Sequence, residues 1–458
     1  MKLLLATYNY PPESFGGSEV YLEALAVELV RAGHSVEILC GSREHAQGSE
    51  RVEIEEGTRD GLNVWRIKLA NTSFSMPELY TTRVPGMRTF WKSWLEGHRP
   101  DVLHFHGRTL AVSQSMMEAA ADLNIPMVFT LHNVPMLCPR TDYITWKGTV
   151  CDGRVELLKC VRCTTATRAA SVMGSAAGAA AGIAMAALTP LLERLPVPDT
   201  SGWSRSQSAL HYPGLLRMQF NAHQEMFGIV RRWHVFSAWS RQALELNGVP
   251  HEKIVLVRHP GPASARATRQ EATSTDLRIG FFGRFVRVKG LPVLLEAMRK
   301  LPDAALRLEI FGDAQEGLED GMAAQVKAAV ARDPRIVWRG RIPHHEQSAA
   351  LAGLDLVVVP SIWVETGPLT VLEAFSAGLP VVGSDLSGIN EWVTEGKNGW
   401  LFPQGNSTAL AAILERLARD RSLIDAAREF PVLDSAQQHA AKIMEIYSSL
   451  FPQGAGKA

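Results

Sequence analysis

The stretch that decides the fold is residues 356–384, LVVVPSIWVETGPLTVLEAFSAGLPVVGS. It begins with an apolar run rich in β-branched residues, Leu356–Val359, passes through a Gly-Pro turn and continues as a helical stretch from about Leu369. A second short apolar run, Val381–Val382, follows the helical stretch. A strand, a helix and a strand in succession predict two parallel strands whose connecting helix covers one face of the sheet.

The same alternation continues along the chain and predicts an α/β fold with helices on both faces of parallel sheets. The other expected strands are Leu277–Phe282, Leu306–Phe311 and Ile336–Trp338 in the C-terminal half, and Lys2–Ala6, Val36–Cys40, Val64–Ile67, Val102–Phe105, Met127–Thr130 and Trp233–Phe236 in the N-terminal half. The polar, aperiodic stretch 260–276 between the two series is typical of a linker. We therefore expect two Rossmann-like domains, 1–261 and 262–435, and a final amphipathic helix within 436–458.

Composition and charge exclude several classes of protein. The chain has 458 residues, of which 46% are hydrophobic, and its 47 basic and 47 acidic residues give a formal net charge of zero. No basic run suggests a nucleic-acid partner. The N-terminal stretch MKLLLATYNYPPE has one Lys and an apolar run too short for a signal peptide, so a cytoplasmic location is expected. In that reducing compartment the five cysteines are not expected to form disulfides.

Two cations follow the predicted strand Leu277–Phe282. The sequence GRFVRVKG places Arg284 and Lys289 just after Gly283, at the carboxyl end of a parallel strand. Ligands of open α/β sheets bind at that edge, and Arg and Lys both suit a phosphate. The motif is not a Walker A loop, because GxxxxGK[ST] is absent. Taken alone, these residues would more often form a solvated basic loop than a phosphate site.

Two carboxylates flank the turn in the opening stretch. Glu365 precedes Gly367 and Pro368, and Glu373 lies one turn inside the helix that follows. A helix that starts after such a turn offers unpaired backbone N–H groups and the positive end of its dipole to an anion. The alternative is that both glutamates are ordinary surface carboxylates.

Order and spacing make the whole set recognisable. The motifs GRFVRVKG (283–290), IFGDA (310–314), WRGRIP (338–343), PSIWVETGPLTVLEAFSAGLPVVGSD (360–385), SGINEWV (387–393) and NGWLF (398–402) resemble the donor domain of the retaining family 4 glycosyltransferases. The resemblance implies the GT-B fold, with two Rossmann-like domains facing each other across a cleft. It also implies that the C-terminal helix packs back on the N-terminal domain.

The resemblance also implies roles for individual residues. Arg284 and Lys289 would bind the donor diphosphate, Glu365 would face the sugar and Glu373 the ribose. The chain reads Glu365-Thr-Gly-Pro-Leu where many relatives have Glu-Gly-Phe or Glu-Asn-Ser. The donor-binding residues expected are Gly16, Gly17, Gly283, Arg284, Lys289, Gly340, Arg341, Ile342, Glu365, Gly367, Pro368, Leu369, Thr370 and Glu373, and the catalytic ones are Glu365, His132, Arg284 and Lys289.

The N-terminal half is expected to bind the acceptor. Gly16-Gly17 stands between the first strand and a helix that Ser18 could cap and Gly33 could end, and it resembles the family's glycine loop. His132 follows the strand Met127–Thr130 and could contact the sugar or transfer a proton, although a packing role is the alternative. Asn133 stands where relatives often have Asp and cannot act as a base.

Four cysteines fall within a loop-like insertion at 138–163. Their pattern is Cys138-x12-Cys151-x8-Cys160-x2-Cys163, which could supply four thiolates to a structural zinc ion. Free buried thiols are the equal alternative. Cys40 lies in a strand and is expected to be a core residue.

Residues 169–192 carry no charge and consist largely of Ala and Gly. Gly174, Gly178 and Gly182 recur every fourth residue, a spacing that favours close helix packing. A single membrane crossing is disfavoured, because it would separate strands expected in one sheet. A packed soluble helix and a helix in the membrane interface remain the two interpretations.

We therefore expect an enzyme that moves a sugar from a UDP- or GDP-sugar to a glycan or lipid-linked acceptor with retention of anomeric configuration, in cell-surface polysaccharide or glycoconjugate synthesis. No Asp-x-Asp occurs, so no catalytic metal is expected. Peripheral association with the inner face of the membrane is compatible with this expectation. The alternatives are an epimerase or phosphorylase on the same fold, and a non-catalytic binding or scaffold subunit.

Overall fold

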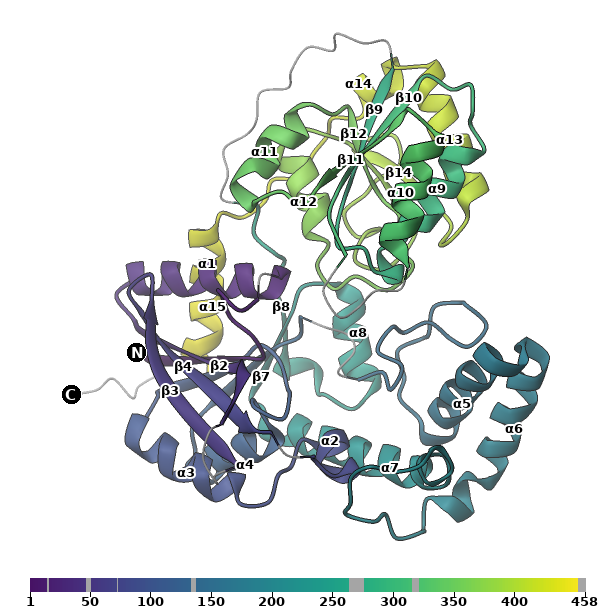
Figure 1. The fold of residues 1–458 in the computed structure, drawn as a ribbon. Coiled ribbons are helices and arrows are strands. Elements are labelled where there is room, and N and C mark those ends of the chain that lie inside the picture. Colours follow the sequence, from purple (N-terminus) through teal and green to yellow (C-terminus); the bar gives the residue numbers. More distant parts are fainter. Residues whose placement is uncertain are drawn as a thin grey trace. The chain divides into compact units, whose positions relative to one another are not determined.

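The computed structural model describes residues 1–14, 16–46, 51–71, 73–132, 137–262, 276–314 and 321–451. They form two compact α/β units, coloured along the chain in Figure 1. Unit 1 comprises Met1–Phe236, Ser240–Val257 and the chain from His439, and unit 2 comprises Ser237–Trp239 and Arg258–Gln438. The contact boundary after Val257 lies four residues before the one expected at 261. Most of the expected linker, 263–275, lies outside the described residues.

Unit 1 is built on a sheet that, in the described part of the chain, has eight strands in the order β3-β4-β2-β1-β5-β6-β7-β8. All neighbouring strands are parallel except β3 and β4, which form an antiparallel hairpin at one edge. The strands are β1 (Lys2–Thr7), β2 (Ser35–Ala46), β3 (Val52–Arg59), β4 (Leu62–Ala70), β5 (Val102–Phe105), β6 (Met127–Thr130), β7 (Arg232–Val235) and β8 (Ile254–Leu256).

Unit 1 also contains helices. They are α1 (Gly17–Arg31), α2 (Met76–Thr81), α3 (Met87–His98), α4 (Gln114–Asp122), α5 (Leu157–Met173), α6 (Ser175–Leu192), α7 (Arg205–Ile229), α8 (Ala238–Leu246) and α15 (Ala436–Ser448). The first turn of α1 differs from the expectation: Gly16 is the N-cap, and the Ser18 hydroxyl donates to Glu19 at 2.8 Å instead of capping the helix. Gly33 ends the helix as expected, with a φ of +87° that favours glycine.

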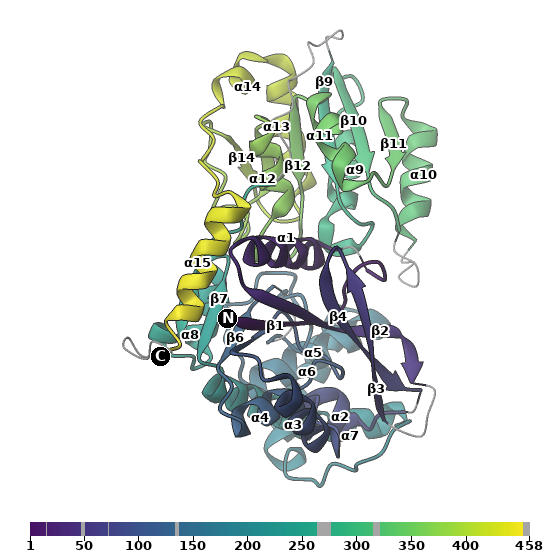
Figure 2. The same cartoon turned by 90° about the vertical axis from the view of Figure 1, so that its left-hand side faces the viewer.

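The expected C-terminal helix is α15, which Figure 2 shows beside the first sheet. Ile443, Ile446 and Tyr447 are buried in one apolar cluster with Leu3 of β1 and Leu22 of α1. The spacing of three and four residues puts them on one face of the helix. The last helix of the chain is therefore part of the core formed by its first strand.

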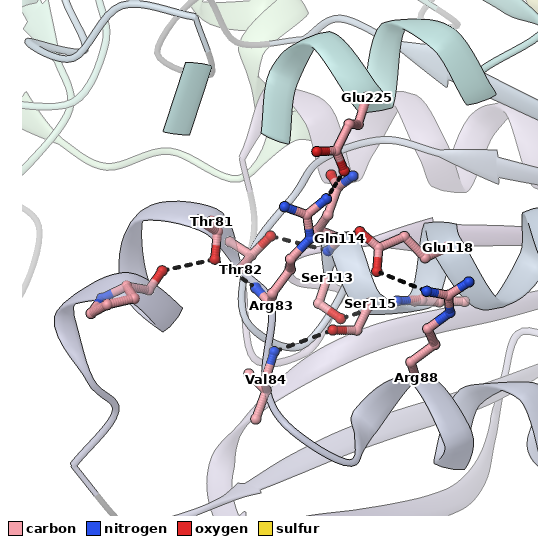
Figure 3. A network of polar contacts seen from close by, with 12 residues as sticks. Thr81, Thr82, Arg83, Val84, Arg88, Ser113, Gln114, Ser115, Glu118 and Glu225 are labelled. Carbon is pink, nitrogen blue, oxygen red and sulfur yellow. Dashed lines mark hydrogen bonds and ion pairs between the residues drawn. The ribbon is translucent and has the colours of Figure 1, made fainter. Parts of the chain in front are cut away.

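A polar network joins α7 to the rest of unit 1 (Figure 3). Arg83 follows α2 and forms ion pairs with Glu118 of α4 and Glu225 of α7. Beside it, the backbone N–H of Gln114 donates to the Thr82 hydroxyl at 3.0 Å. These contacts fix one end of α7, the long helix against which α5 and α6 pack.

The insertion differs from the expected loop followed by a single helix. Cys160 and Cys163 lie in α5, and α6 is a separate helix, because Gly174 adopts a φ of +86° and ends α5. Among the described residues, α6 is the helix that is long and apolar enough to cross a membrane by length and composition.

Unit 2 is built on a parallel sheet with the order β11-β10-β9-β12-β13-β14 within the described residues. The strands are β9 (Leu277–Phe282), β10 (Leu306–Phe311), β11 (Ile336–Gly340), β12 (Leu356–Val359), β13 (Val381–Ser384) and β14 (Gly399–Phe402), and the helices are α9 (Leu291–Arg299), α10 (Met322–Arg332), α11 (His344–Ala352), α12 (Leu369–Ser376), α13 (Ser407–Arg419) and α14 (Ser422–Ala426). This is the doubly wound order 3-2-1-4-5-6 of a Rossmann fold.

The core of unit 1 contains a chain of buried histidines. His104 bonds to Tyr447 of α15 at 2.6 Å and to Thr130 at 2.6 Å, and Thr130 bonds in turn to His234 at 2.9 Å. His106 lies 2.9 Å from His132. Burial lowers the pKa of His104, His106 and His234 well below the usual range, with a smaller contribution from the neighbouring histidines. These imidazoles are therefore neutral at pH 7.

We predict that removing a core side chain of α15 destabilises unit 1 and leaves unit 2 unaffected. Ile443 is fully buried, so Ile443→Ala removes core contacts and should cost about 2–5 kcal/mol. Hydrogen exchange should then quicken in β1 and α1. The matched control is Ile424→Ala in α14, which is equally buried in the core of unit 2. Faster exchange confined to unit 2 in the Ile443→Ala protein would contradict the packing described.

We also predict that unit 1 loses stability as the pH falls below about 6.5. A histidine kept neutral by the fold has a lower pKa folded than unfolded, so the unfolded state binds more protons in acid. Each such histidine lowers the free energy of unfolding by up to about 1.4 kcal/mol for every unit that the pH falls below about 6.5. His104→Gln should flatten the dependence of the unfolding free energy on pH between 7 and 5.

Candidate active site

The strand order of unit 2 reverses between β9 and β12. The chain proceeds from β9 outward to β10 and β11 on one side, then returns to β12 and continues to β13 and β14 on the other. In doubly wound sheets, the loops at the carboxyl ends of the two strands at such a switch point diverge and leave room for a ligand. Here these loops carry Lys289 after β9 and Glu365 after β12.

Lys289 and Glu365 form an ion pair, although 76 residues separate them in the sequence. The Lys289 ammonium donates to Glu365 Oε1 at 2.7 Å. The same oxygen accepts hydrogen bonds from the Ser361 hydroxyl at 2.7 Å and from the Trp363 indole at 3.0 Å. The ammonium also lies 5.6 Å from the centre of the Trp363 ring, a cation–π distance.

The pair keeps a buried carboxylate ionised. Glu365 is 7% exposed, and burial alone would raise its pKa. The charge of Lys289 and the hydrogen bonds from Lys289, Ser361 and Trp363 outweigh that effect and hold the pKa below its usual value. Glu365 is therefore an anion at neutral pH and not a proton donor.

Glycines lock the loops that carry the pair. Gly290 has a φ of +72°, and a Cβ there would lie 1.7 Å from the Pro360 carbonyl oxygen. Gly388, after β13, has a φ of +89°, and a Cβ there would lie 1.9 Å from the Glu365 carbonyl oxygen. Only glycine fits at both positions, because the backbone conformation and the contact distance each exclude a side chain.

Glycines also stand at the carboxyl ends of β9, β10 and β11: Gly283, Gly312 and Gly340. The Gly283 amide donates to Phe311 at 3.0 Å, and the Gly312 amide donates to Gly340 at 2.9 Å. A Cβ on Gly312 would lie 1.9 Å from the Gly283 carbonyl oxygen. Arg284 and Arg341 follow two of these glycines and are exposed, and Ile342 packs against the apolar cluster beneath.

Helix α12 begins at Leu369 with Pro368 as its N-cap residue and no side-chain capping hydrogen bond. Thr370 therefore lies in the first turn, as expected. Glu373 lies one turn further and accepts a hydrogen bond from the Gln347 amide of α11 at 2.6 Å. The structure thus brings Lys289 together with Glu365, and gives Glu373 a different partner.

In unit 1, the expected glycine loop surrounds a carboxylate. Gly16 is extended and precedes α1, whose first residue is Gly17. Glu19 is buried in the first turn and accepts hydrogen bonds from Ser14 and Ser18, each at 2.8 Å. A Cβ on Gly16 would lie 2.6 Å from a Glu19 oxygen. Glu19 therefore occupies part of the helix start beside Gly16 and Gly17, which the resemblance placed among the donor-binding residues.

His132 is half-buried at the end of β6. Its Nε2 lies 2.9 Å from His106 Nδ1, and its ring packs against Tyr21 and Phe236. Burial, with a contribution from His439, lowers the pKa of His132 to about 3. The ring is therefore neutral at working pH. Asn133 lies outside the described residues.

Two family models match the chain. Residues 16–184 match the glycosyl transferase 4-like domain, and residues 276–420 match the model of glycosyl transferases group 1. The chain belongs to the family 4 glycosyltransferases.

This chain also has named relatives that agree with that assignment. It is 32% identical to the amylovoran biosynthesis glycosyltransferase AmsK of Erwinia amylovora, over 40% of this chain and 46% of AmsK. It is 34% identical to the putative colanic acid biosynthesis glycosyltransferase WcaL of Salmonella typhimurium, over 43% of this chain and 50% of WcaL. The match thus spans about half the length of these relatives.

Solved structures share the fold over nearly the whole chain. HepE of Anabaena, in complex with UDP and glucose, has a TM-score of 0.62 at 17% identity, covering 98% of this chain and 100% of HepE. Sucrose-phosphate synthase of Thermosynechococcus elongatus has a TM-score of 0.63 at 16% identity, covering 98% and 99%. Together with its two parallel-sheet units, this likeness gives the glycosyltransferase the GT-B fold.

The sequence analysis missed several residues of this site. His259 is buried against Gly367, where a Cβ would lie 2.1 Å from the imidazole. Ser361 and Trp363 hold the Glu365 carboxylate, and Gln347 holds Glu373. Ser361 and Trp363 lie within the quoted motif, so their nearness to Glu365 was a usable signal. Nothing in the sequence connects Gln347 or His259 to the motif.

The cysteines of the insertion do not form a recognisable metal centre. Among the described residues, which include all four, no three His, Cys, Asp or Glu side chains are arranged to hold a metal ion. Burial raises the pKa of Cys138, Cys151 and Cys160, the last to about 12, so these thiols are protonated at neutral pH. The zinc interpretation of Cys138, Cys151, Cys160 and Cys163 stays a prediction. Cys40 is a buried core residue, as expected.

We predict that Lys289→Met reverses the effect of pH on the stability of unit 2. In the wild type the fold depresses the pKa of Glu365. The ionised carboxylate therefore adds to the stability of unit 2 above the pKa that Glu365 has in the unfolded chain, and this added stability is lost as the pH falls. Without Lys289, burial dominates and should raise the pKa of Glu365, so that unit 2 loses stability as the pH rises through about 4–7. Carboxyl carbon NMR of Glu365 measures the titration directly.

The exposed ion pair between Arg299 and Glu296 provides the matched control for this experiment. Arg299→Met removes a solvent-screened pair and should leave the Glu365 titration unchanged. An unchanged Glu365 titration in the Lys289→Met protein would show that the ion pair does not set the charge of this carboxylate.

Proposed function

We propose that this glycosyltransferase moves a sugar from a UDP- or GDP-sugar to a glycan or lipid-linked acceptor, with retention of anomeric configuration. The observation that carries the proposal is the Lys289–Glu365 ion pair at the switch point of the donor unit. It combines a fixed cation with a carboxylate that is charged at neutral pH, beside the start of α12. The names of AmsK and WcaL, and the UDP in HepE, support a polysaccharide product and a nucleotide-sugar donor.

In the proposed reaction, the bond between the anomeric carbon and the diphosphate oxygen breaks, and the acceptor oxygen bonds to the same face of that carbon. Arg284, Lys289 and the backbone N–H groups at the start of α12 would stabilise the charge that develops on the departing diphosphate. The acceptor hydroxyl loses its proton as its oxygen bonds to the sugar, and the departing diphosphate is the group that can take that proton up. These cations replace the divalent ion that other glycosyltransferases use.

The two glutamates would have different tasks. Glu365 is anionic and rigid, so it would accept hydrogen bonds from sugar hydroxyls and balance positive charge at the anomeric carbon. Glu373, held by Gln347 on α11, would bind the ribose hydroxyls. His132 is neutral, so a hydrogen-bond contact suits it better than the role of a cationic acid.

We predict that Lys289→Ala slows transfer by roughly 30-fold or more. The loss of one preorganised group that stabilises developing charge costs at least about 2 kcal/mol of transition-state stabilisation. The matched control is Arg287→Ala, which removes an exposed cation from the same short segment. Turnover should fall for Lys289→Ala and stay near the wild-type value for Arg287→Ala. Equal rates for both variants would remove Lys289 from the mechanism.

The donor is identified first, by screening nucleotide-sugars for thermal stabilisation, because a ligand at 100 times its Kd adds about 2.7 kcal/mol. Product analysis then separates the alternatives. A new glycosidic bond of unchanged anomeric configuration supports transfer with retention. An epimerised nucleotide-sugar or a sugar phosphate would indicate an epimerase or a phosphorylase, and binding without turnover would indicate a scaffold subunit.

A further inference from the structure

Helices α5 and α6 form a hairpin whose two members are packed unusually closely. A Cβ on Gly178 would lie 2.6 Å from the Ala166 carbonyl oxygen of α5, and a Cβ on Gly182 would lie 2.7 Å from that of Arg162. The glycines thus let the two backbones meet along one face of α6. Through α5 the hairpin packs on α7, where Val161 joins Tyr212 and Leu216 in a small apolar cluster.

The opposite face of α6 is an exposed apolar stripe. Ile183, Leu188 and Leu191 are 54%, 50% and 66% exposed. Only 17% of the residues of α6 are buried, although the helix is apolar enough to cross a membrane. Seven exposed positions recur at intervals that place them on one side of the helix: Ala176, Ala180, Ile183, Ala184, Ala187, Leu188 and Leu191. Ser175 and Pro190 are exposed as well.

The tip of the hairpin extends this apolar surface. Val172 is 84% exposed and Met173 is 60% exposed, immediately before the turn at Gly174. No Asp, Glu, Lys or Arg occurs from residue 169 to residue 192. An uncharged surface of this extent is uncommon on a protein that exposes it only to water.

The segment that carries the apolar surface has an excess of positive charge. Residues 154–217 contain seven Lys and Arg but three Asp and Glu, a formal charge of +4 in a chain whose net charge is zero. Three of the seven cations form ion pairs: Arg154 with Glu156, Lys159 with Asp152, and Arg217 with Glu193. Arg168 lies in the half of α5 nearer the tip, over the ring of Tyr212. An apolar face on a positively charged segment matches the acyl chains and anionic headgroups of a lipid leaflet.

A protein partner fits this face less well. Interfaces between proteins draw most of their binding energy from Trp, Tyr and Arg side chains in shaped pockets. The stripe on α6 has no aromatic residue and no Arg, and most of its members are alanines, which offer little shape to recognise. A lipid surface adapts to such a face, since it needs no matching pockets.

The fold also limits how deeply the hairpin can enter. Strand β6 precedes the hairpin and β7 follows it, and the two strands pair in one sheet, with Val128 opposite Arg232. The chain must therefore return to the side from which it left. Helix α5 carries Lys159, Arg162 and Arg168, which oppose burial in hydrocarbon. A shallow position in the interface satisfies both constraints.

We propose that the exposed face of α6 and the hairpin tip dock this protein on an anionic lipid surface. An 18-residue helix is about 27 Å long, enough to anchor the unit along one leaflet. The inference is independent of the proposed transfer reaction.

The test is co-sedimentation with vesicles. The protein should bind vesicles of phosphatidylcholine with a quarter phosphatidylglycerol, bind pure phosphatidylcholine at least ten-fold more weakly, and dissociate as salt increases. Leu188→Glu with Leu191→Glu should reduce binding to the anionic vesicles at least ten-fold. The matched control is Leu79→Glu with Val432→Glu, which changes two exposed apolar residues elsewhere and should leave binding unchanged.

Absence of vesicle binding, or equal binding by both double variants, would overturn the proposal. A wild-type dimer in solution that Leu188→Glu with Leu191→Glu dissociates, without vesicle binding, would assign the face to a second copy of the chain instead. Thermal melting of each variant confirms that the fold is intact. Transfer to a water-soluble acceptor should be the same in all variants, so a failure of lipid docking is distinct from a failure of the proposed function.

Discussion

The ion pair of Lys289 with Glu365 is the interaction around which unit 2 is arranged. A buried carboxylate is costly unless charge and hydrogen bonds compensate it, and here a cation, a hydroxyl and an indole converge on one oxygen. Those donors come from loops after two different strands. The backbones of these loops must therefore meet closely, which Gly290 permits at Pro360. Gly290 is therefore needed because the ion pair requires the backbone at this position to lie against the Pro360 carbonyl.

The two units treat buried titratable groups in opposite ways. Unit 2 buries Glu365 as an ion because its partner is fixed beside it. Unit 1 buries several histidines that bond to hydroxyls, a backbone carbonyl and another imidazole. The neutral form is then the stable one. Acid consequently acts on the two units through different groups, by protonating imidazoles in one and by discharging an ion pair in the other.

The sequence predicted those elements whose signal is local. Apolar β-branched runs such as Leu277–Phe282 became strands with those bounds, because a parallel strand buried on both faces needs such a run. Strand β3, VEIEEGTR, was not predicted, because an edge strand with one solvated face carries few apolar residues. Ser18 was expected to cap α1, but its hydroxyl donates to the buried Glu19 carboxylate instead. The resemblance supplied Lys289 and Glu365 as site residues, whereas their contact depends on the strand order, which spacing alone does not reveal.

The same limit applies to the α5–α6 hairpin, where composition predicted close packing but not which face would remain outside. Two constraints fix that face together. Gly178 and Gly182 must lie against α5, because a side chain at either position would collide with its backbone. Pairing of β6 with β7 requires the hairpin to begin and end at one sheet. With the glycine face turned inward and the ends tied, Ile183, Leu188 and Leu191 have no position left but the outside. The exposed apolar stripe is thus a consequence of how the insertion folds, and the positive charge of the segment that carries it determines which surface it suits.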